Sequence, residues 1–318
     1  MQDSEVFLQQ LITGLSNGMI IALIALGYTM VYGIIELINF AHGDVFMLGA
    51  FLALTLLGMF GMEAWPQHWQ LAGVVLMLVS CAAFCGTLNW SLDRLAYRPL
   101  RRASKLSLLV SAIGCSFICT NLGLFWGGMP MDVFAGGVAA AAPKDFPQLV
   151  PQYNLLGESA VRVVPADIAV LVVTIPLMIA LVYLVKRTRL GRAMRAVAQD
   201  STAAALMGIP VDRVIGVTFF IGGALGGFAS VVYALYNNTI GFQMGYRAGM
   251  DAFTAAVLGG IGSLPGAVLG GLTIGCVRAM SDQYVETRWT NTIVFGILVL
   301  ILIFRPSGLL GSTRREKV

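Results

Sequence analysis

The sequence predicts an all-α, polytopic bundle of transmembrane helices that forms a single domain over residues 1–318. The chain is 58% hydrophobic and only 11% charged, whereas a soluble domain carries roughly 25% charged residues. Apolar stretches of the length that crosses a bilayer recur along the chain. Glycine and proline interrupt some of them, which is typical of broken or re-entrant helices. Lipid is therefore the expected solvent of this chain.

About 20 apolar residues cross a bilayer as a helix. This length predicts continuous crossings at 7–34, 45–62, 71–92, 106–128, 166–186, 214–236 and 290–304. The apolar stretch 252–281 is too long for one ordinary crossing and is interrupted by Gly262-Ser-Leu-Pro-Gly266. Because Pro265 cannot continue a helical hydrogen-bond ladder, we predict two short helices that form a re-entrant hairpin over 252–281.

Positive charge predicts the orientation, because cytoplasmic loops are rich in lysine and arginine. Basic residues gather in the three segments 93–105, 186–213 and 305–317: Arg94, Arg98, Arg101, Arg102, Lys105; Lys186, Arg187, Arg189, Arg192, Arg195, Arg213; Arg305, Arg314, Arg315, Lys317. The stretch 130–165 holds only Lys144 and Arg162, and we expect an irregular periplasmic loop there. The N-terminus is then periplasmic and the C-terminus cytoplasmic, which requires the hairpin to return to the face it entered.

Two interruptions stand out, at Asn39–Asp44 and at Leu258–Ser263. Paired interruptions in oppositely oriented halves indicate a weak inverted repeat and point to the transport route. We therefore predict a route lined by polar side chains and exposed backbone at these breaks, from Asn39, His42, Gly43, Asp44, Gly259, Gly260, Gly262 and Ser263. The alternative is that both breaks are kinks that only fit helices together.

The titratable residues favour no catalytic role. Glu36, His42 and Asp44 could relay protons, but we expect them at the cytoplasmic interface, with Asp44 capping the helix 45–62. The remaining acids, Asp251 among them, are expected at the ends of crossings. No catalytic residue and no metal site is predicted, because the five cysteines lie in apolar stretches without accompanying histidine or acid. Glycines four residues apart, such as Gly14/Gly18, predict close helix packing, with a dimer face as the alternative.

The segment 186–213 predicts an ordered docking structure. Arg189, Arg192 and Arg195 recur every three residues and share one face of a short helix. Asp200 is a favourable N-cap for a second, alanine-rich helix that contains Ala203 and Ala204, and Gly208 and Pro210 end it. A basic loop that touches anionic lipid headgroups is the alternative. A capped helix favours insertion into a groove on a protein partner.

Several of these stretches resemble the branched-chain amino acid permeases of ABC importers: Ala22–Gly33, Ile38–Asp44, Gly191–Pro210, Ala255–Gly266 and Phe304–Gly311. The resemblance covers nearly the whole chain except 130–165. It implies the ABC importer permease fold, a bacterial inner membrane location and 186–213 as the cytoplasmic coupling loop. Arg192, Arg195, Asp200, Ala203, Ala204 and Gly208 would shape the contact with the ATPase. The glutamate of the family's coupling motif is replaced by Thr202.

The resemblance also implies the partners. They are a second homologous permease, two cytoplasmic ATP-binding subunits, a periplasmic amino-acid-binding protein and the lipid bilayer, with no nucleic acid. The chain itself is expected to hold no cofactor, since ATP is bound by the partner subunits and no glycine precedes a lysine as in a Walker A loop. The alternatives are a permease of the same family for urea, short amides or other amino acids, and an ion-coupled secondary carrier.

Overall fold

The computed structural model describes residues 3–36, 39–101, 103–157, 160–305 and 307–311. Its elements are α1 (Asp3–Ile35), α2 (Ala41–Phe60), η1 (Met62–Ala64), α3 (Gln67–Leu92), η2 (Asp93–Tyr97), α4 (Arg98–Leu100), α5 (Lys105–Gly127), η3 (Asp132–Gly137), β1 (Lys144–Asp145), α6 (Pro165–Arg187), α7 (Arg189–Gln199), α8 (Ser201–Leu206), α9 (Val211–Asn237), β2 (Thr239–Ile240), α10 (Met244–Gly259), α11 (Leu264–Tyr284) and α12 (Thr287–Phe304). Five residues named above, Ile38, Arg102, Arg314, Arg315 and Lys317, lie outside the described part.

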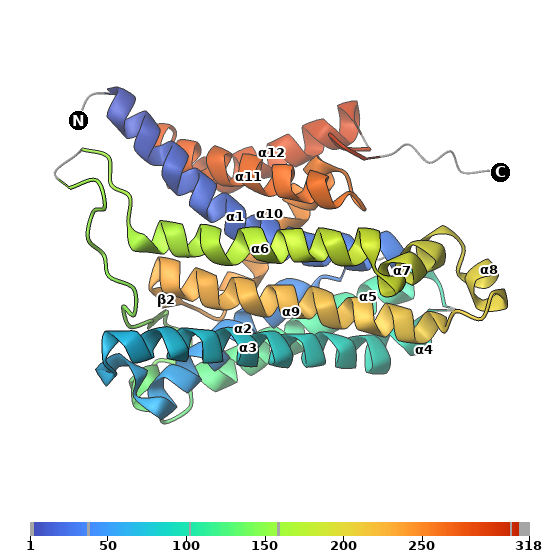
Figure 1. Ribbon diagram of the computed structural model, residues 1–318, viewed down its shortest axis with the longest axis horizontal. Helices are drawn as coiled ribbons and strands as arrows, with labels where there is room; N and C mark the ends of the chain where they lie inside the picture. Colours follow the sequence, from blue (N-terminus) through green and yellow to red (C-terminus); the bar gives the residue numbers. More distant parts are fainter. Residues whose placement is uncertain (1–2, 37–38, 102, 158–159, 306, 312–318) are drawn as a thin grey trace.

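Long apolar helices dominate the structure (Figure 1). Within the described residues, eight of them are long and apolar enough to cross a membrane. The seven continuous crossings predicted from the sequence are confirmed as helices, each within a few residues of its expected ends. The eighth is α11, which is longer than a short re-entrant arm. The chain is therefore a multi-pass membrane protein, and lipid replaces water around its apolar outer helices.

Two glycine-mediated helix crossings form the centre of the bundle. A side-chain carbon on Gly14 or Gly18 of α1 would lie 2.8 or 2.9 Å from the backbone of Cys276 or Leu272 of α11. A side-chain carbon on Gly223 of α9 would overlap the carbonyl oxygen of Cys85 on α3, and one on Gly227 would overlap the carbonyl oxygen of Cys81. Only glycine allows backbones to approach this closely. The predicted role of these glycine pairs in packing is confirmed.

These two crossings relate α1–α3 to α9–α11. In each half, the first helix crosses the third helix of the other half, and the second helix is the shortest of the three. Because α1 and α9 run in opposite directions (Figure 1), the two halves form an inverted repeat. By this correspondence the segment before α2 matches the segment before α10, and 61–66 matches 260–263. The expected pairing of Asn39–Asp44 with Leu258–Ser263 is therefore wrong by one helix.

Helix α2 begins inside the bundle. A side-chain carbon on Gly27 of α1 would overlap the imidazole of His42, and His42 also faces Gly226 of α9, while Gly222 of α9 packs against the backbone of Gly27. Gly27 lies about 12 Å before the end of α1, and Gly222 about 16 Å after the start of α9, at 1.5 Å per residue. The prediction that Asp44 caps a helix 45–62 at the interface is wrong, because α2 already begins at Ala41 and Asp44 is buried.

Helix α10 begins beside the start of α2. A side-chain carbon on Gly43 would overlap the carbonyl oxygen of Gly245, and one on Gly249 would lie 3.1 Å from the hydroxyl of Tyr28. The break expected within 252–281 is present at residues 260–263, but the two helices run over 244–259 and 264–284. The predicted length of both arms is therefore too short. The C-terminal tail packs on this break, where the amides of Leu309 and Leu310 donate to Leu258 and Gly259.

The stretch 130–165 contains little regular structure, as expected. Among its described residues are the six-residue 3-10 helix η3 and the strand β1, which pairs antiparallel with β2 after α9. Lys144 is buried in this loop, and its ammonium donates to the carbonyls of Phe134 and Ala139 at 3.2 and 2.7 Å. The β1–β2 pair fixes the loop against the end of the bundle opposite to α7 and α8 (Figure 1).

Candidate functional site

Helix α7 is anchored to the bundle by its apolar face. Gly191, Met194 and Val197 are buried, while Arg189 and Arg192 are exposed. The Thr188 hydroxyl caps the helix by accepting from the amide of Gly191 at 3.1 Å. A side chain at Gly191 would overlap the Val185 carbonyl of α6, so glycine is required for this tight turn between the two helices.

The exposed arginines of α7 do not all have the same role. Arg195 donates to the carbonyl oxygen of Val185 at the end of α6. A cation there is favourable, because the carbonyls at a helix C-terminus carry partial negative charge. Arg189 and Arg192 remain exposed at the surface. Of the two arginines predicted for coupling, Arg192 is therefore available to a partner, whereas Arg195 also holds α6 to α7.

Helix α8 has the caps that the sequence predicts. One oxygen of Asp200, Oδ1, accepts from the amides of Thr202 and Ala203 at 2.8 and 2.9 Å. The helix ends at Leu206, and Gly208 adopts a left-handed conformation with φ +80°. Ala204 is 4% exposed and faces the protein.

Beyond Ala204, α8 presents apolar side chains to the outside. Leu206 and Met207 are 85% and 83% exposed, at an end of the bundle (Figure 1). Two large apolar side chains on a rigid, capped helix form a suitable anchor for a groove on a partner. We call α8 with the turn that follows it, Ser201–Gly208, the docking helix, after the role predicted from the sequence.

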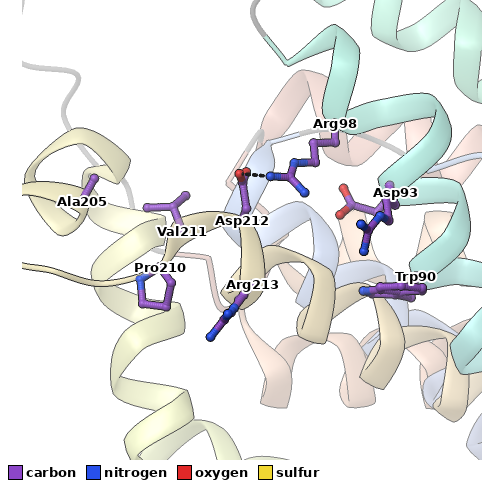
Figure 2. Close-up of a pocket in the computed structure, with 9 residues that line it drawn as sticks. Trp90, Asp93, Arg98, Ala205, Pro210, Val211, Asp212 and Arg213 are labelled. Atoms are coloured by element: carbon purple, nitrogen blue, oxygen red, sulfur yellow. Dashed lines mark hydrogen bonds and ion pairs between the residues drawn. The ribbon is translucent and has the colours of Figure 1, made fainter.

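A cleft of about 620 Å³ separates the docking helix from the end of α3. Figure 2 shows its lining residues, which come from α3 and the turn after it on one side and from 205–213 on the other. Arg94 lies over the ring of Trp90, with its guanidinium carbon 5.3 Å from the ring centre. The lining is mostly polar and charged, so the cleft suits a polar surface of a partner.

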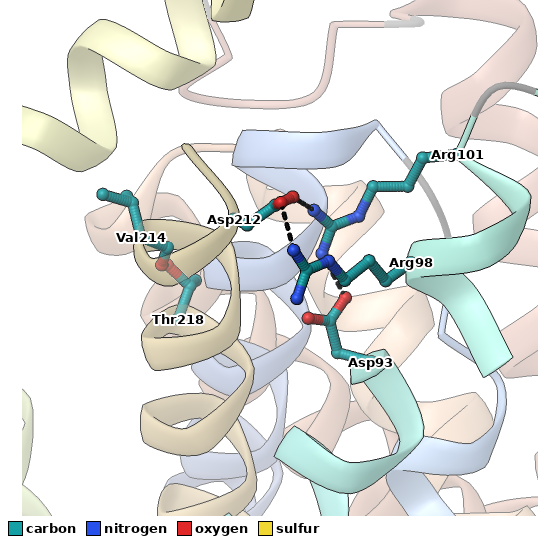
Figure 3. Close-up of polar contacts among 6 residues, drawn as sticks. All are labelled: Asp93, Arg98, Arg101, Asp212, Val214 and Thr218. Atoms are coloured by element: carbon teal, nitrogen blue, oxygen red, sulfur yellow. Dashed lines mark hydrogen bonds and ion pairs between the residues drawn. The ribbon is translucent and has the colours of Figure 1, made fainter. Parts of the chain in front are cut away.

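An ion-pair cluster connects the two sides of this cleft (Figure 3). The carboxylate of Asp212, in the first turn of α9, accepts from Arg98 at 2.5 Å and from Arg101 at 2.7 Å. Arg101 also contacts the buried carboxylate of Asp93 at 2.5 Å. Displacement of α9 at its start therefore acts directly on the end of α3 through these ion pairs.

The first group of predicted route residues is packed inside the bundle. Asn39 donates to Asn89 at 3.0 Å and accepts from the Tyr97 hydroxyl at 2.7 Å, which joins the break to α3 and η2. Asn89 in turn donates to the carbonyl of Phe219 on α9 at 2.7 Å. These contacts give Asn39 a structural role at the centre of the protein.

Asp44 and His42 are buried beside Asn39. The hydroxyls of Ser116 and Thr120 on α5 donate to the Asp44 carboxylate at 2.5 and 3.1 Å. The carboxylate also lies at the start of α2 and beside Gly245 at the start of α10, so the positive ends of two helix dipoles stabilise it. Neither ring nitrogen of His42 forms a hydrogen bond of good geometry with a described residue, and the Ile24 carbonyl is the acceptor that faces it.

The second group lies at the far end of α10. Gly259 packs against Gly266, and Gly260 packs against Gly308 and Gly311 of the tail. Ser263 caps α11 by accepting from the amide of Gly266 at 3.2 Å. The two groups are thus separated by the length of α10, about 20 Å between Gly245 and Gly259. The structure does not bring the predicted route residues together into one cavity.

Two sets of charged residues were not assigned a role from the sequence. One is the Asp93–Arg98–Arg101–Asp212 cluster. The other is the ion pair between Asp251 and Arg278, with 3.1 Å between the carboxylate Oδ2 and the guanidinium Nε. Asp251 was expected at the end of a crossing, which is wrong, because it lies in the second turn of a helix that begins inside the bundle. The sequence signal was present as three charges in one apolar region, Arg247, Asp251 and Arg278.

Comparison with known proteins places this fold in a family. The family model described as the permease component of the branched-chain amino acid transport system matches residues 10–303. The chain is 42% identical to the high-affinity branched-chain amino acid transport permease BraD of Pseudomonas aeruginosa, over 98% of each chain. It is 40% identical to the corresponding permease LivH of Escherichia coli K12, also over 98% of each chain.

A second permease of the same bacterial system is related more distantly. LivM of Escherichia coli K12 is 30% identical over 132 residues, which cover 41% of this chain and 30% of LivM. No solved structure matches the chain. The chain belongs to the branched-chain amino acid transport system permease family.

Proposed function

We propose that this protein is the membrane-spanning permease subunit of an ABC importer that moves branched-chain amino acids from the periplasm to the cytoplasm of a bacterium. The similarity to BraD and LivH over nearly the whole chain supports the substrate class. The exposed apolar tip of the docking helix, at Leu206 and Met207, is the observation that supports ATP-driven coupling.

The partners follow from this proposal. Two ATP-binding subunits dock on the cytoplasmic side, at the end of the bundle that holds α7 and α8. A second homologous permease completes the pathway in the inner membrane, and a periplasmic binding protein delivers the amino acid. The N-terminus is then periplasmic and the C-terminus cytoplasmic, in line with the basic segments 93–105 and 186–213. The chain holds no cofactor, because its partners bind ATP.

Coupling begins at the docking helix. ATP-driven closure of the ATPases moves α8, which continues through Pro210 into α9. The start of α9 is tied to α3 through Asp212 and its two arginines. Further along, α9 contacts His42 at the start of α2 through Gly226, and Gly27 of α1 through Gly222. A push on α8 therefore reaches the interior point where α2 and α10 begin, and the two halves rock about this point.

The docking claim is tested by affinity purification in mild detergent. Gly208→Pro removes the left-handed conformation at φ +80°, because proline fixes φ near −65°. Leu206→Ser removes an exposed apolar contact without changing the backbone. We expect both variants to lose the co-purifying ATPase while the permease stays inserted. Leu156→Ser, at a half-exposed site of the 130–165 loop, is the matched control and keeps the complex.

Transport itself is tested in proteoliposomes. We expect leucine uptake only when ATP, both ATPases and the binding protein are present. Uptake by the isolated chain that collapses with an ion gradient would contradict the proposal and favour a secondary carrier. An unchanged complex in both docking-helix variants would contradict the role of α8, even if ATP-dependent uptake were observed.

A further inference from the structure

Three charged residues lie on one face of the hairpin formed by α10 and α11. Arg247 is exposed at the surface of α10. The side chains of Asp251 and Arg278 are 13% and 21% exposed. All three belong to helices rich in glycine and alanine, and a further acid, Asp282, lies one turn after Arg278 on α11, where its carboxylate accepts from Thr290. We call Arg247, Asp251 and Arg278 the charged triad.

The charged triad lies at membrane depth. Arg247 and Asp251 occupy the first two turns of α10, which begins beside the buried start of α2 rather than at an end of the bundle. Charged side chains at this depth are costly against lipid and are found facing a polar cavity or another protein element. The face of α10 that carries Arg247 therefore borders a polar space in the assembled transporter.

The triad has unused hydrogen-bonding capacity of both signs. Arg278 uses its Nε on Asp251 Oδ2 and donates from a terminal nitrogen to the side-chain oxygen of Asn291 on α12 at 2.7 Å. The other oxygen of Asp251 and the guanidinium of Arg247 form no hydrogen bond with the described residues. A purely structural ion pair would explain Asp251 and Arg278, but it would not require a second arginine one turn from Asp251 whose guanidinium has no hydrogen bond to the described residues.

We propose that the charged triad binds the α-carboxylate and α-ammonium groups of a free amino acid on the solute route. Arg247 receives the carboxylate through its planar fork, and the free oxygen of Asp251 accepts from the ammonium. Arg278 is a positioning residue, because it holds Asp251 and is itself held by Asn291. This inference deepens the proposed function and rests on it, since it assigns the substrate's charged groups to residues of this chain.

The pairing explains why apolar amino acids of different side-chain shape can share one route. A zwitterion leaves water only if both of its charges find partners. The two charges of an amino acid are separated by one carbon. The triad places the carboxylate of Asp251 and the guanidinium of Arg247 one helical turn apart on α10. Recognition of these groups leaves the side chain of the solute free to contact apolar surfaces.

The first test measures ATP-driven leucine uptake by the reconstituted complete transporter, with the binding protein at saturation. We expect Arg247→Gln to lower the uptake rate at least about 10-fold, equivalent to about 1.4 kcal/mol, in the range lost with one charge-assisted hydrogen bond. Arg247→Lys keeps the positive charge but loses the planar guanidinium with its paired donors, and we expect an intermediate rate. Arg288→Gln is the matched control, because Arg288 is an exposed arginine paired with Glu286, and it keeps the wild-type rate.

The second test separates binding from structural pairing. Removing both partners of an ion pair is far less damaging than removing one, because no unpaired charge remains. If the Asp251–Arg278 pair only holds helices together, the double variant Asp251→Asn/Arg278→Gln recovers the uptake that Asp251→Asn loses. We expect no recovery, because the acceptor for the ammonium is still missing.

The outcomes of the two tests are distinguishable from failure of the proposed function. Absence of ATP-dependent uptake by the wild-type complex would contradict the proposed function itself. With wild-type uptake present, an Arg247→Gln rate within two-fold of the Arg288→Gln control would overturn the triad. Recovery of uptake in the double variant would also overturn the triad proposal. If the second permease were lost when Arg247→Gln is purified, the proposal would be overturned as well, since Arg247 would then contribute to the contact between the two permeases.

Discussion

The helices α2 and α10 at the centre of the molecule begin in the same way but differ in their charged residues. Both α2 and α10 follow a long helix, begin inside the bundle and approach each other at Gly43 and Gly245. At the start of α2, Asp44 is buried and held by two hydroxyls of α5. At the start of α10, Arg247 is exposed, and its guanidinium has no hydrogen bond to the described residues.

This difference assigns a structural role to Asp44 and a ligand-binding role to the charges of α10, although both lie in equivalent helices of the repeat. A carboxylate that is satisfied by protein groups, as Asp44 is, contributes to folding and has little capacity left for a solute. A charge that stays unsatisfied at membrane depth is maintained at a cost in stability and indicates a ligand. The repeat therefore provides two equivalent helix starts, and only the second one carries the charged triad.

The largest expected effect concerns the glycine crossings that make the halves equivalent. Gly275→Leu on α11 and Gly227→Leu on α9 each drive a side chain into the backbone of the facing helix, and we expect each to destabilise the fold by about 3 kcal/mol or more. Thermal unfolding in detergent measures this, with Gly296→Leu as a control at an open site of α12. A large loss of stability at one glycine crossing and none at the other would contradict the inverted repeat.

The second prediction compares the two buried or half-buried acids. Asp44→Ala leaves the Ser116 and Thr120 hydroxyls without their acceptor, and we expect a loss of about 3 kcal/mol in unfolding free energy. Asp251→Ala should cost less, because Arg278 keeps Asn291 as a partner. Thermal unfolding of the two variants beside Asp132→Ala, at an exposed acid, decides the order. The reverse order would show that the acid of α10 is the structural one.

A smaller effect is expected at the α2–α3 contact. The thiol of Cys81 donates to the Gly49 carbonyl at 3.3 Å, and the backbone of the same residue lies against Gly227. Cys81→Ala keeps the helix backbones in place and removes one weak hydrogen bond, so we expect about 1 kcal/mol of destabilisation. A loss as large as that of Gly227→Leu would mean that α3 depends on the thiol rather than on close backbone contact.

The smallest effect is expected at the exposed cluster. Asp212 is half exposed and shared by two arginines, so Asp212→Asn should lower stability by less than about 1 kcal/mol, and by less still at high salt. Unfolding temperatures at two salt concentrations measure this. The same variant should also slow ATP-driven uptake, because it loosens α9 from α3. Expressed as free energies, we expect the effect on the uptake rate to exceed the effect on unfolding. If the two free energies were equal, the cluster would be only a surface contact.

Much of the docking helix could be predicted from the sequence. Asp200 as N-cap and Gly208 at the end depend on residues within one turn of the helix, and local chemistry decides them. The ion pairs of Asp212 could not be predicted, because its partners lie on the other side of the cleft, more than a hundred positions earlier in the chain. The Asp251–Arg278 pair was missed for a related reason: the hairpin boundaries that bring both residues to one face depend on packing.

Composition and apolar length by themselves determined that this chain folds in lipid as a helical bundle, and local caps determined the docking helix. Where α2 and α10 begin was decided only by the tertiary structure. Each of these helices starts where it meets glycines of distant segments: α2 lies against Gly27, Gly226 and Gly245, and α10 against Gly43. Because those contacts replace the partners that a local cap would supply, no nearby residue in the sequence reveals the position.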